Sequence, residues 1–239
     1  MAQLVFDHVT VAYPIYNARA MSMRNHLVRL TTGGRIGAEA GHVVTVTALD
    51  DVSFTLNEGD AVGLIGHNGA GKSTLLRTMA GIYSPTIGSV RRQGSVSTIF
   101  ELGAGMDMEL SGYDNIVRVM LLLGKSRAEA KSFIPEIESF TELGEFLRLP
   151  VRTYSAGMTT RLMFAVATLV DPAIVLIDEV FGTGDASFQD KARARMEAMI
   201  SSADIFVFAS HDLTLIKQLC NRIFRLEHGK ITEMSPDEL

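Results

Sequence analysis

Residues 61–74 read AVGLIGHNGAGKST, a short apolar run that passes directly into a glycine-rich turn. The stretch fits the phosphate-binding pattern G-x-x-x-x-G-K-[ST] at every required position. Glycines permit the backbone angles and the close approach that let consecutive N–H groups point at phosphate oxygens. We therefore predict a nucleotide-binding loop that consists of Gly66, His67, Asn68, Gly69, Ala70, Gly71, Lys72, Ser73 and Thr74.

The last residues of this loop include a positively charged side chain and a candidate metal ligand. Lys72 is expected to reach the terminal phosphates, and Ser73 offers a hydroxyl to Mg²⁺. The helix that should begin here directs its positive end at the bound anion. A structural loop that merely contains Gly-Lys-Ser is the alternative, but the apolar strand before the loop and the helical LLRTMA after it favour a nucleotide site.

Composition narrows the class of protein. A chain of 239 residues is long enough for a sizeable buried core, and its net charge of −5 provides no field that would attract nucleic acid. The single Cys220 excludes an internal disulfide and is expected to be a buried, inert thiol in a reducing compartment. No apolar run approaches the length of a membrane span, and the N-terminus lacks the form of a signal peptide, so we expect a cytoplasmic chain.

Two kinds of apolar pattern predict two kinds of strand. Alternating patterns are typical of half-buried antiparallel strands and occur at 4–13, 43–48 and 51–56. Continuous apolar runs are typical of parallel strands covered on both faces and occur at 61–65, 173–177 and 205–209. A further strand is expected at 94–100. The fold class is therefore α/β, with a mostly parallel sheet and an antiparallel flank.

A basic segment interrupts the antiparallel flank at 14–41. It contains four arginines, and no acidic residue occurs between Asp7 and Glu39; the arginines are Arg19, Arg24, Arg29 and Arg35. Met23, Leu27 and Leu30 have helical spacing after Ser22, which predicts a short amphipathic helix followed by a glycine-rich loop at 31–41. Such a helix suits an anionic membrane surface, but a surface helix packed on its own domain fits equally well.

The region 102–160 has a helical pattern, with periodic segments at 115–124 and 128–147. It is expected to form a helical subdomain inserted into the core. The predicted organisation is thus an antiparallel flank and phosphate loop at 1–101, the helical subdomain at 102–160, and the remainder of the core at 161–239.

Polar residues follow two of the buried runs. Asp178 and Glu179 end the run IVLIDE, where Asp178 would hold Mg²⁺ through water and Glu179 would orient or deprotonate an attacking water. A simple strand-end cap is the alternative for this pair. His211 follows the run at 205–209, at the strand end where α/β sheets bind their ligands, although an isolated histidine is more often structural.

A second anion-binding helix end is predicted at YSAGM, residues 154–158. Ser155, Ala156 and Gly157 combine a hydroxyl with small residues at the start of a helical pattern. One chain has no obvious way to direct both helix ends at one nucleotide. Two copies arranged head to tail would do so.

The motif order resembles the ATP-binding subunit of an ABC transporter over nearly the whole chain. GHNGAGKST resembles the Walker A loop, IVLIDE the Walker B strand with its catalytic Glu179, and YSAGM the signature motif. The resemblance also implies a D-loop ending at Asp185, a switch histidine at His211 and an adenine-stacking ring at Tyr13. It further implies a P-loop NTPase (RecA-like) core, ATP and Mg²⁺ as cofactors, ATPase activity, an ATP-sandwich homodimer, and an integral membrane permease subunit in two copies as partner.

Two stretches resemble exporters of polysaccharides built on a polyprenyl lipid, such as O-antigen and teichoic acid. They are FDHVTVAYPIYNARAMSMRNHLVR at 6–29 and FELGAGMDMELSGYDNI at 100–116. This resemblance implies a lipid-linked glycan cargo and a peripheral position at the cytoplasmic face of the inner membrane. An ABC transporter for a drug, lipid or ion is the first alternative, and a soluble mechanical or regulatory ABC ATPase is the second.

The chain departs from the family pattern in two places. Glu101 stands where most members have the Q-loop glutamine, so a carboxylate replaces an amide near Mg²⁺ and the γ-phosphate and becomes a candidate metal ligand. The chain ends at RLEHGKITEMSPDEL, where the core normally stops. We therefore expect no C-terminal carbohydrate-binding domain.

Overall fold

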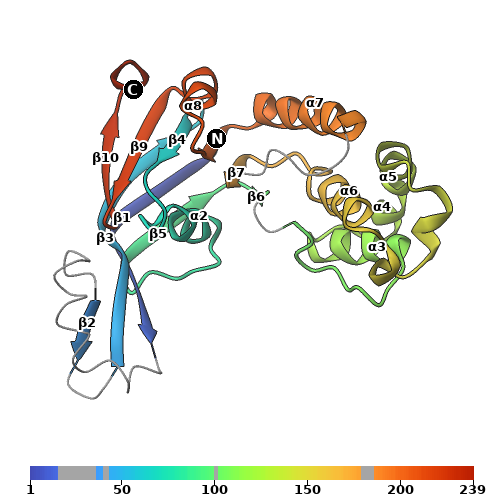
Figure 1. Ribbon diagram of the computed structural model, residues 1–239, viewed down its shortest axis with the longest axis horizontal. Helices are drawn as coiled ribbons and strands as arrows, with labels where there is room; N and C mark the ends of the chain where they lie inside the picture. The colour runs from blue at the N-terminus through green and yellow to red at the C-terminus, as the bar shows by residue number, and fades with distance from the viewer. Residues whose placement is uncertain (16–35, 40–42, 100–101, 179–185) are drawn as a thin grey trace. The chain divides into compact units, whose positions relative to one another are not determined.

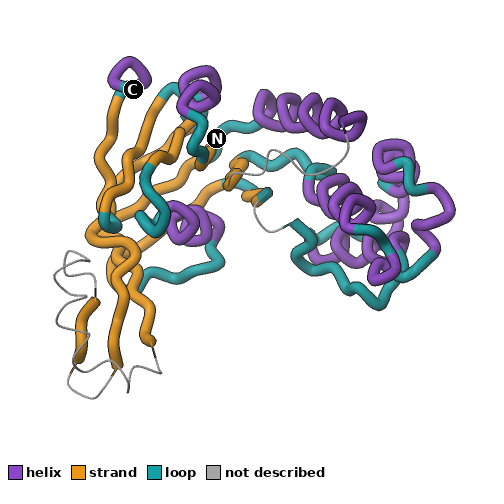
Figure 2. The backbone as a smooth tube through the Cα atoms, viewed as in Figure 1, coloured by secondary structure: helices purple, strands orange, loops and turns teal. Residues whose placement is uncertain are grey.

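The computed structural model describes residues 1–15, 36–39, 43–99, 102–178 and 186–239. These form two compact units. The first joins Met1–Val96, Leu176–Glu179 and Asp204–Leu239, and the second joins Ser97–Val175 and Val180–Ala203. Figure 2 shows that the first is mostly strands and the second mostly helices.

The antiparallel sheet of the first unit has the strand order β2-β3-β1-β5. Its two long strands lie side by side, and Leu4 faces Leu56 while Tyr13 faces Val46 (Figure 1). The strands are β1 (Gln3–Ile15), β2 (Ile36–Glu39), β3 (Val43–Asn57) and β5 (Ile87–Gln93). The segments predicted as separate strands at 43–48 and 51–56 form the single strand β3, whose backbone is irregular at Asp51, where φ is 52°.

The glycine-rich segment 31–41 was predicted as a loop, and this is wrong for Ile36–Glu39, which forms β2. Ile36 pairs with Val46 and Glu39 with Val43. The free edge of β3 supplies hydrogen-bond partners to any backbone that lies beside it, so pairing overrides the weak strand propensity of this sequence. Residues 16–35, 40 and 41 of the basic segment, which include its predicted helix and all four arginines, lie outside the described residues.

The second sheet has six strands in the order β10-β9-β4-β8-β7-β6. At its centre β4 pairs in parallel with both β8 and β9, and the predicted runs in β4, β7 and β8 are buried. The strands are β4 (Ala61–Ile65), β6 (Val96–Thr98), β7 (Ile174–Asp178), β8 (Ile205–Ala209), β9 (Arg222–Glu227) and β10 (Lys230–Met234). The α/β class with a mostly parallel sheet and an antiparallel flank is confirmed, although β6 is shorter than the predicted strand at 94–100.

Helix α2 (Lys72–Ala80) follows the phosphate loop and has a glycine at each end. At Gly71 φ is 118°, and a Cβ built there would lie 2.7 Å from the backbone oxygen of Ala48. At the other end Arg92 donates hydrogen bonds to the oxygens of Met79 and Thr78, each over 2.7 Å. Positive charge at a helix C-terminus is favourable, so both ends of α2 are held in place.

The C-terminal part of the first unit contains two short helical elements. Helix α8 (Leu213–Leu219) is capped by the Asp212 side chain, and η4 (Pro236–Glu238) follows β10. Cys220 ends α8 and is buried, as predicted. No helix in the described part of the chain is both long enough and apolar enough to cross a membrane.

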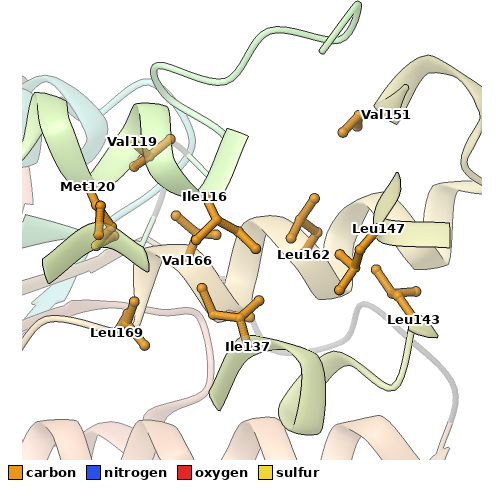
Figure 3. Packing of buried hydrophobic residues seen from close by; sticks show 12 residues of the cluster. Ile116, Val119, Met120, Ile137, Leu143, Leu147, Val151, Leu162, Val166 and Leu169 are labelled. Atoms are coloured by element: carbon orange, nitrogen blue, oxygen red, sulfur yellow. The ribbon is translucent and has the colours of Figure 1, made fainter. Parts of the chain in front are cut away.

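Most helices of the second unit pack around one apolar cluster. Ile116, Ile137, Leu162 and Val166 come from three helices and lie close together at its centre (Figure 3). The elements are α3 (Gly112–Leu122), α4 (Arg127–Ser132), α5 (Ile134–Thr141), η2 (Gly144–Arg148), η3 (Val151–Thr153), α6 (Ala156–Ala167) and α7 (Ala186–Ser202). Helix α6 shares the core of α3 and α5. The domain boundaries expected at 101 and 160 remain predictions.

A buried amide organises the start of this unit. Asn115 is fully buried; its Oδ1 accepts from the N–H of Asp107, and its Nδ2 donates to the oxygens of Asp107, Leu110 and Ser111. An unpaired buried amide would be strongly destabilising, so this set of bonds fixes the loop 107–111 against α3.

Candidate nucleotide-binding site

The predicted phosphate loop connects β4 to α2 and lines a pocket of about 380 Å³. All lining residues belong to the first unit: His67, Asn68, Gly69, Gly71, Lys72, Ser73, Thr74, Asp178 and His211. The pocket has the backbone N–H groups of a helix start at one wall and charged or polar side chains at the others. This is the arrangement that binds phosphate groups.

Lys72 and Ser73 begin α2 and hold different positions in the pocket. Lys72 Nζ donates to Gly66 O over 2.6 Å and approaches His67 O at 3.5 Å, so its ammonium group lies across its own loop. Ser73 Oγ donates to Asp178 Oδ2 over 2.7 Å. The structure therefore brings together a lysine ammonium, a hydroxyl and a carboxylate, all three expected from the sequence at the nucleotide.

Asp178 is half-buried at the end of β7, and His211 is exposed just beyond β8. Both strands belong to the same sheet as β4, so their ends lie at the edge where the phosphate loop begins. Such an edge is where α/β sheets bind ligands. The predicted nucleotide roles of both residues remain predictions.

The turn between β9 and β10 closes on the back of the phosphate loop, which sequence reasoning missed. Gly229 N donates to Ala70 O over 3.1 Å. Gly66 has φ 151°, and a Cβ built there would lie 2.4 Å from Leu226 O. His228 in this turn also lies beside His67, with ring centroids 5.6 Å apart. The loop therefore has a rigid support, and only glycine fits at position 66.

Tyr13 lies beside the start of α2, where its hydroxyl is 3.4 Å from Thr74 Oγ1. Burial raises the pKa of Tyr13 above its usual value. Its ring meets that of Tyr83 almost at right angles, with centroids 5.5 Å apart, and the Arg77 guanidinium lies 5.9 Å from the centre of the Tyr83 ring. The sequence motifs pointed to Tyr13 but not to Tyr83 or Arg77. The one feature of the sequence that could have indicated Tyr83 is its aromatic ring shortly after the glycine that ends α2.

The predicted second anion-binding end lies in the other unit. Ser155 is the N-cap of α6, and its Oγ accepts from the N–H of Met158 over 3.3 Å. Ser155, Ala156 and Gly157 are all exposed, and among the described residues no atom outside the helix lies within 4 Å of a Cβ built at Gly157. A pocket of about 360 Å³ adjoins this helix start. The placement of these three residues against a nucleotide on a second copy remains a prediction.

Three candidate site residues, Glu101, Glu179 and Asp185, lie outside the described residues. The metal site is thus represented by Ser73 and Asp178. Hydroxyl and carboxylate oxygens suit Mg²⁺, which at nucleotide sites takes only one or two carboxylates besides phosphate and water. The side chains present therefore fit the predicted metal.

A family comparison agrees with this geometry. The family described as "ABC transporter" matches residues 49–182, which include the phosphate loop, the signature segment and Asp178. The chain belongs to the ABC transporter family. The resemblance inferred from the order of motifs is thereby confirmed.

Two relatives and one solved structure show how far the ABC transporter likeness extends. The O-antigen export system ATP-binding protein RfbE of Yersinia enterocolitica is 70% identical over 239 residues, 100% of both chains. The teichoic acids export ATP-binding protein TagH of Staphylococcus haemolyticus is 36% identical over 95% of this chain and 82% of its own. The dimeric post-hydrolysis structure of the ATP-binding cassette MJ0796, bound to ADP and Pi, has a TM-score of 0.69 at 19% identity and covers 98% of each chain. The similarity to this solved structure supports the α/β fold described above.

Proposed function

We propose that this chain is the ATP-hydrolysing subunit of an ABC exporter that moves a lipid-linked polysaccharide of the O-antigen type across the cytoplasmic membrane. The observation that carries the proposal is the 70% identity, over the full length of both chains, to a protein named for O-antigen export. A relative named for teichoic acid export supports the same broader class of cargo. The lipid carrier of the glycan is part of the proposal and rests on the resemblance.

The described pocket suits ATP hydrolysis. Lys72 supplies positive charge where negative charge develops on the transferred phosphoryl group, and the N–H groups of the loop hold the neighbouring phosphates. Ser73 and Asp178 would hold Mg²⁺, which would supply positive charge to the phosphate oxygens. His211 at the edge of the pocket contacts the γ-phosphate.

Four further residues complete the proposed site. Glu179 follows Asp178 directly and polarises the attacking water. Tyr13 stacks on the adenine, which agrees with its position beside Thr74. Glu101 is a candidate ligand of the metal, and Asp185, at the end of the proposed D-loop, belongs to the nucleotide-binding set.

The active form is a homodimer that sandwiches two ATP molecules. The phosphate loop of one copy supplies one wall of each site, and the exposed Ser155, Ala156 and Gly157 of the other copy supply the second wall. An exposed helix start with small residues is suited to that role, because no described atom outside its own helix lies within 4 Å of a Cβ built at Gly157. Two copies bind two copies of an integral membrane permease subunit at the cytoplasmic face, and ATP-driven closure changes the conformation of the permease.

Substitution of the proposed water-polarising residue tests this function. Glu179→Gln should abolish steady-state hydrolysis and trap an ATP-bound dimer, which size-exclusion chromatography detects. In the host the same variant should cause a lipid-linked polymer to accumulate on the cytoplasmic side, and its composition identifies the cargo. Glu58→Gln, at an exposed turn of the first unit, is the matched control and should behave as wild type. Normal turnover by Glu179→Gln would overturn the role of Glu179, and accumulation of no polymer would overturn the cargo.

A further inference from the structure

We propose that Tyr83 is a positioning residue for nucleotide binding: it holds the ring of Tyr13 in the orientation that receives the base. The inference rests on the proposed function, in which Tyr13 stacks on adenine. It adds a second aromatic residue that no sequence motif assigns to this site.

The geometry of the two rings carries the first step. Their centroids lie 5.5 Å apart with an interplanar angle of 72°, which is the edge-to-face arrangement that aromatic pairs prefer. Both side chains are partly buried. The other end of the Tyr13 side chain is its hydroxyl, 3.4 Å from Thr74 Oγ1 at the first turn of α2. A ring held at its hydroxyl by one weak contact needs a second contact to fix its plane, and Tyr83 provides that contact.

The loop that carries Tyr83 is itself held at both ends. At its start, Ile82 N and Tyr83 N both donate to Arg77 O, over 2.9 and 3.2 Å. At its end, Thr86 N donates to Thr10 O over 2.8 Å, and Thr86 Oγ1 accepts from Ala12 N over 3.1 Å. The second attachment is to the residue before Tyr13 in β1. Tyr83 is therefore held against both the phosphate-loop helix and the strand that carries Tyr13.

The guanidinium of Arg77 lies over the Tyr83 ring at 5.9 Å from its centroid, within the range of a cation–π contact. Arg77 is in the last turn of α2, the helix that begins at the phosphate loop. The chain of contacts thus runs from Tyr13 through Tyr83 to Arg77. These contacts set the plane of the Tyr13 ring relative to α2, the helix that also carries Lys72.

Binding measurements on the full chain separate base contact from phosphate contact. Calorimetry gives the Kd of Mg-ADP, which needs both contacts, and of pyrophosphate, which needs the phosphate loop alone. Tyr83→Leu should weaken ADP binding about 2- to 10-fold, the range of one aromatic pair, and leave pyrophosphate binding unchanged. Tyr83→Phe keeps the ring and should restore ADP binding to within about twofold of wild type. In steady-state hydrolysis, Tyr83→Leu should raise KM for ATP without lowering kcat.

A double-mutant cycle tests whether Tyr83 acts through Tyr13. In a Tyr13→Leu background, Tyr83→Leu should have no further effect on ADP binding. An equal loss in both backgrounds would show that Tyr83 acts independently and would overturn the inference. Equal weakening of ADP and pyrophosphate would also overturn it, because the variant would then have damaged the phosphate loop. If Tyr13→Leu leaves ADP binding unchanged, the proposed stacking of Tyr13 on adenine is wrong. If Tyr13→Leu weakens ADP binding but Tyr83→Leu does not, Tyr13 keeps its stacking role and the positioning role of Tyr83 is wrong.

Discussion

Ser73 Oγ donates a hydrogen bond to Asp178 Oδ2 over 2.7 Å, which joins the start of α2 to the end of β7. The two residues are 105 positions apart in the chain, yet both were expected at the metal from their local motifs. Their contact holds a carboxylate and a hydroxyl at the edge of the phosphate pocket, where oxygen ligands for Mg²⁺ are needed.

Removal of the negative charge of Asp178 should abolish most of the ATP hydrolysis. Asp178→Asn keeps the size of the side chain and its contact with Ser73 but removes the negative charge that favours Mg²⁺. We expect Mg²⁺-dependent ATP hydrolysis to fall about 100-fold or more, as measured by phosphate release. Asp171→Asn, an exposed aspartate in the segment before β7, is the control and should retain wild-type activity. Hydrolysis by Asp178→Asn within a few-fold of wild type would contradict the metal role.

Two glycines of the phosphate loop should differ in their tolerance of alanine. Gly69→Ala meets no atom within 4 Å and has only backbone strain at φ 79°, so a loss of about 1–2 kcal/mol in unfolding free energy is expected. Gly71→Ala adds a Cβ 2.7 Å from Ala48 O at φ 118°, and we expect a loss of about 3 kcal/mol or more. Urea unfolding of the nucleotide-free protein measures both. Equal losses would mean that β3 moves away freely from the loop.

The buried thiol should be unreactive in the folded protein. Burial raises the pKa of Cys220 from 9.0 to about 12, and the thiolate is the reactive form. At pH 8 a disulfide reagent should therefore label the native chain at least about 10-fold more slowly than the urea-unfolded chain. Rapid labelling of native protein would show that the end of α8 opens readily.

The raised pKa of Cys220 also predicts that the free energy of unfolding falls at alkaline pH. Below about pH 9 the thiol is protonated in both states, so its contribution to stability is fully present. Between about pH 9 and pH 12 the unfolded chain ionises while the folded chain resists, so stability falls as the pH rises. Cys220→Ala removes this contribution, and its unfolding free energy should decline less steeply over that interval than that of wild type.

Local patterns predicted those parts of the site whose residues adjoin one another in the chain. The phosphate loop and Asp178 each follow a continuous apolar run, because a buried parallel strand needs apolar side chains on both faces and delivers its last residues to one edge of the sheet. Two helices of the second unit were predicted for a similar reason, since Ile116 and Ile137 belong to segments with a helical period.

Features that depend on distant segments were not predictable in this way. The strand Ile36–Glu39 exists because the edge of β3 is available to it, and its own glycine-rich sequence gives no sign of that partner. Tyr83 has no motif of its own, and its importance follows from the ring of Tyr13, which approaches it from another strand. The contact between Gly229 and Ala70 joins two turns that are far apart in the chain, and no local spacing encodes it.

That last contact has a consequence for the newly made protein. The ribosome releases the chain from its N-terminus, so the phosphate loop emerges long before the turn of β9 and β10 that supports it. A nascent or truncated chain that lacks this turn carries the complete GKST motif but lacks Leu226 and Gly229 against the back of the loop. The support behind the phosphate loop is therefore completed only when β9 and β10 have been made.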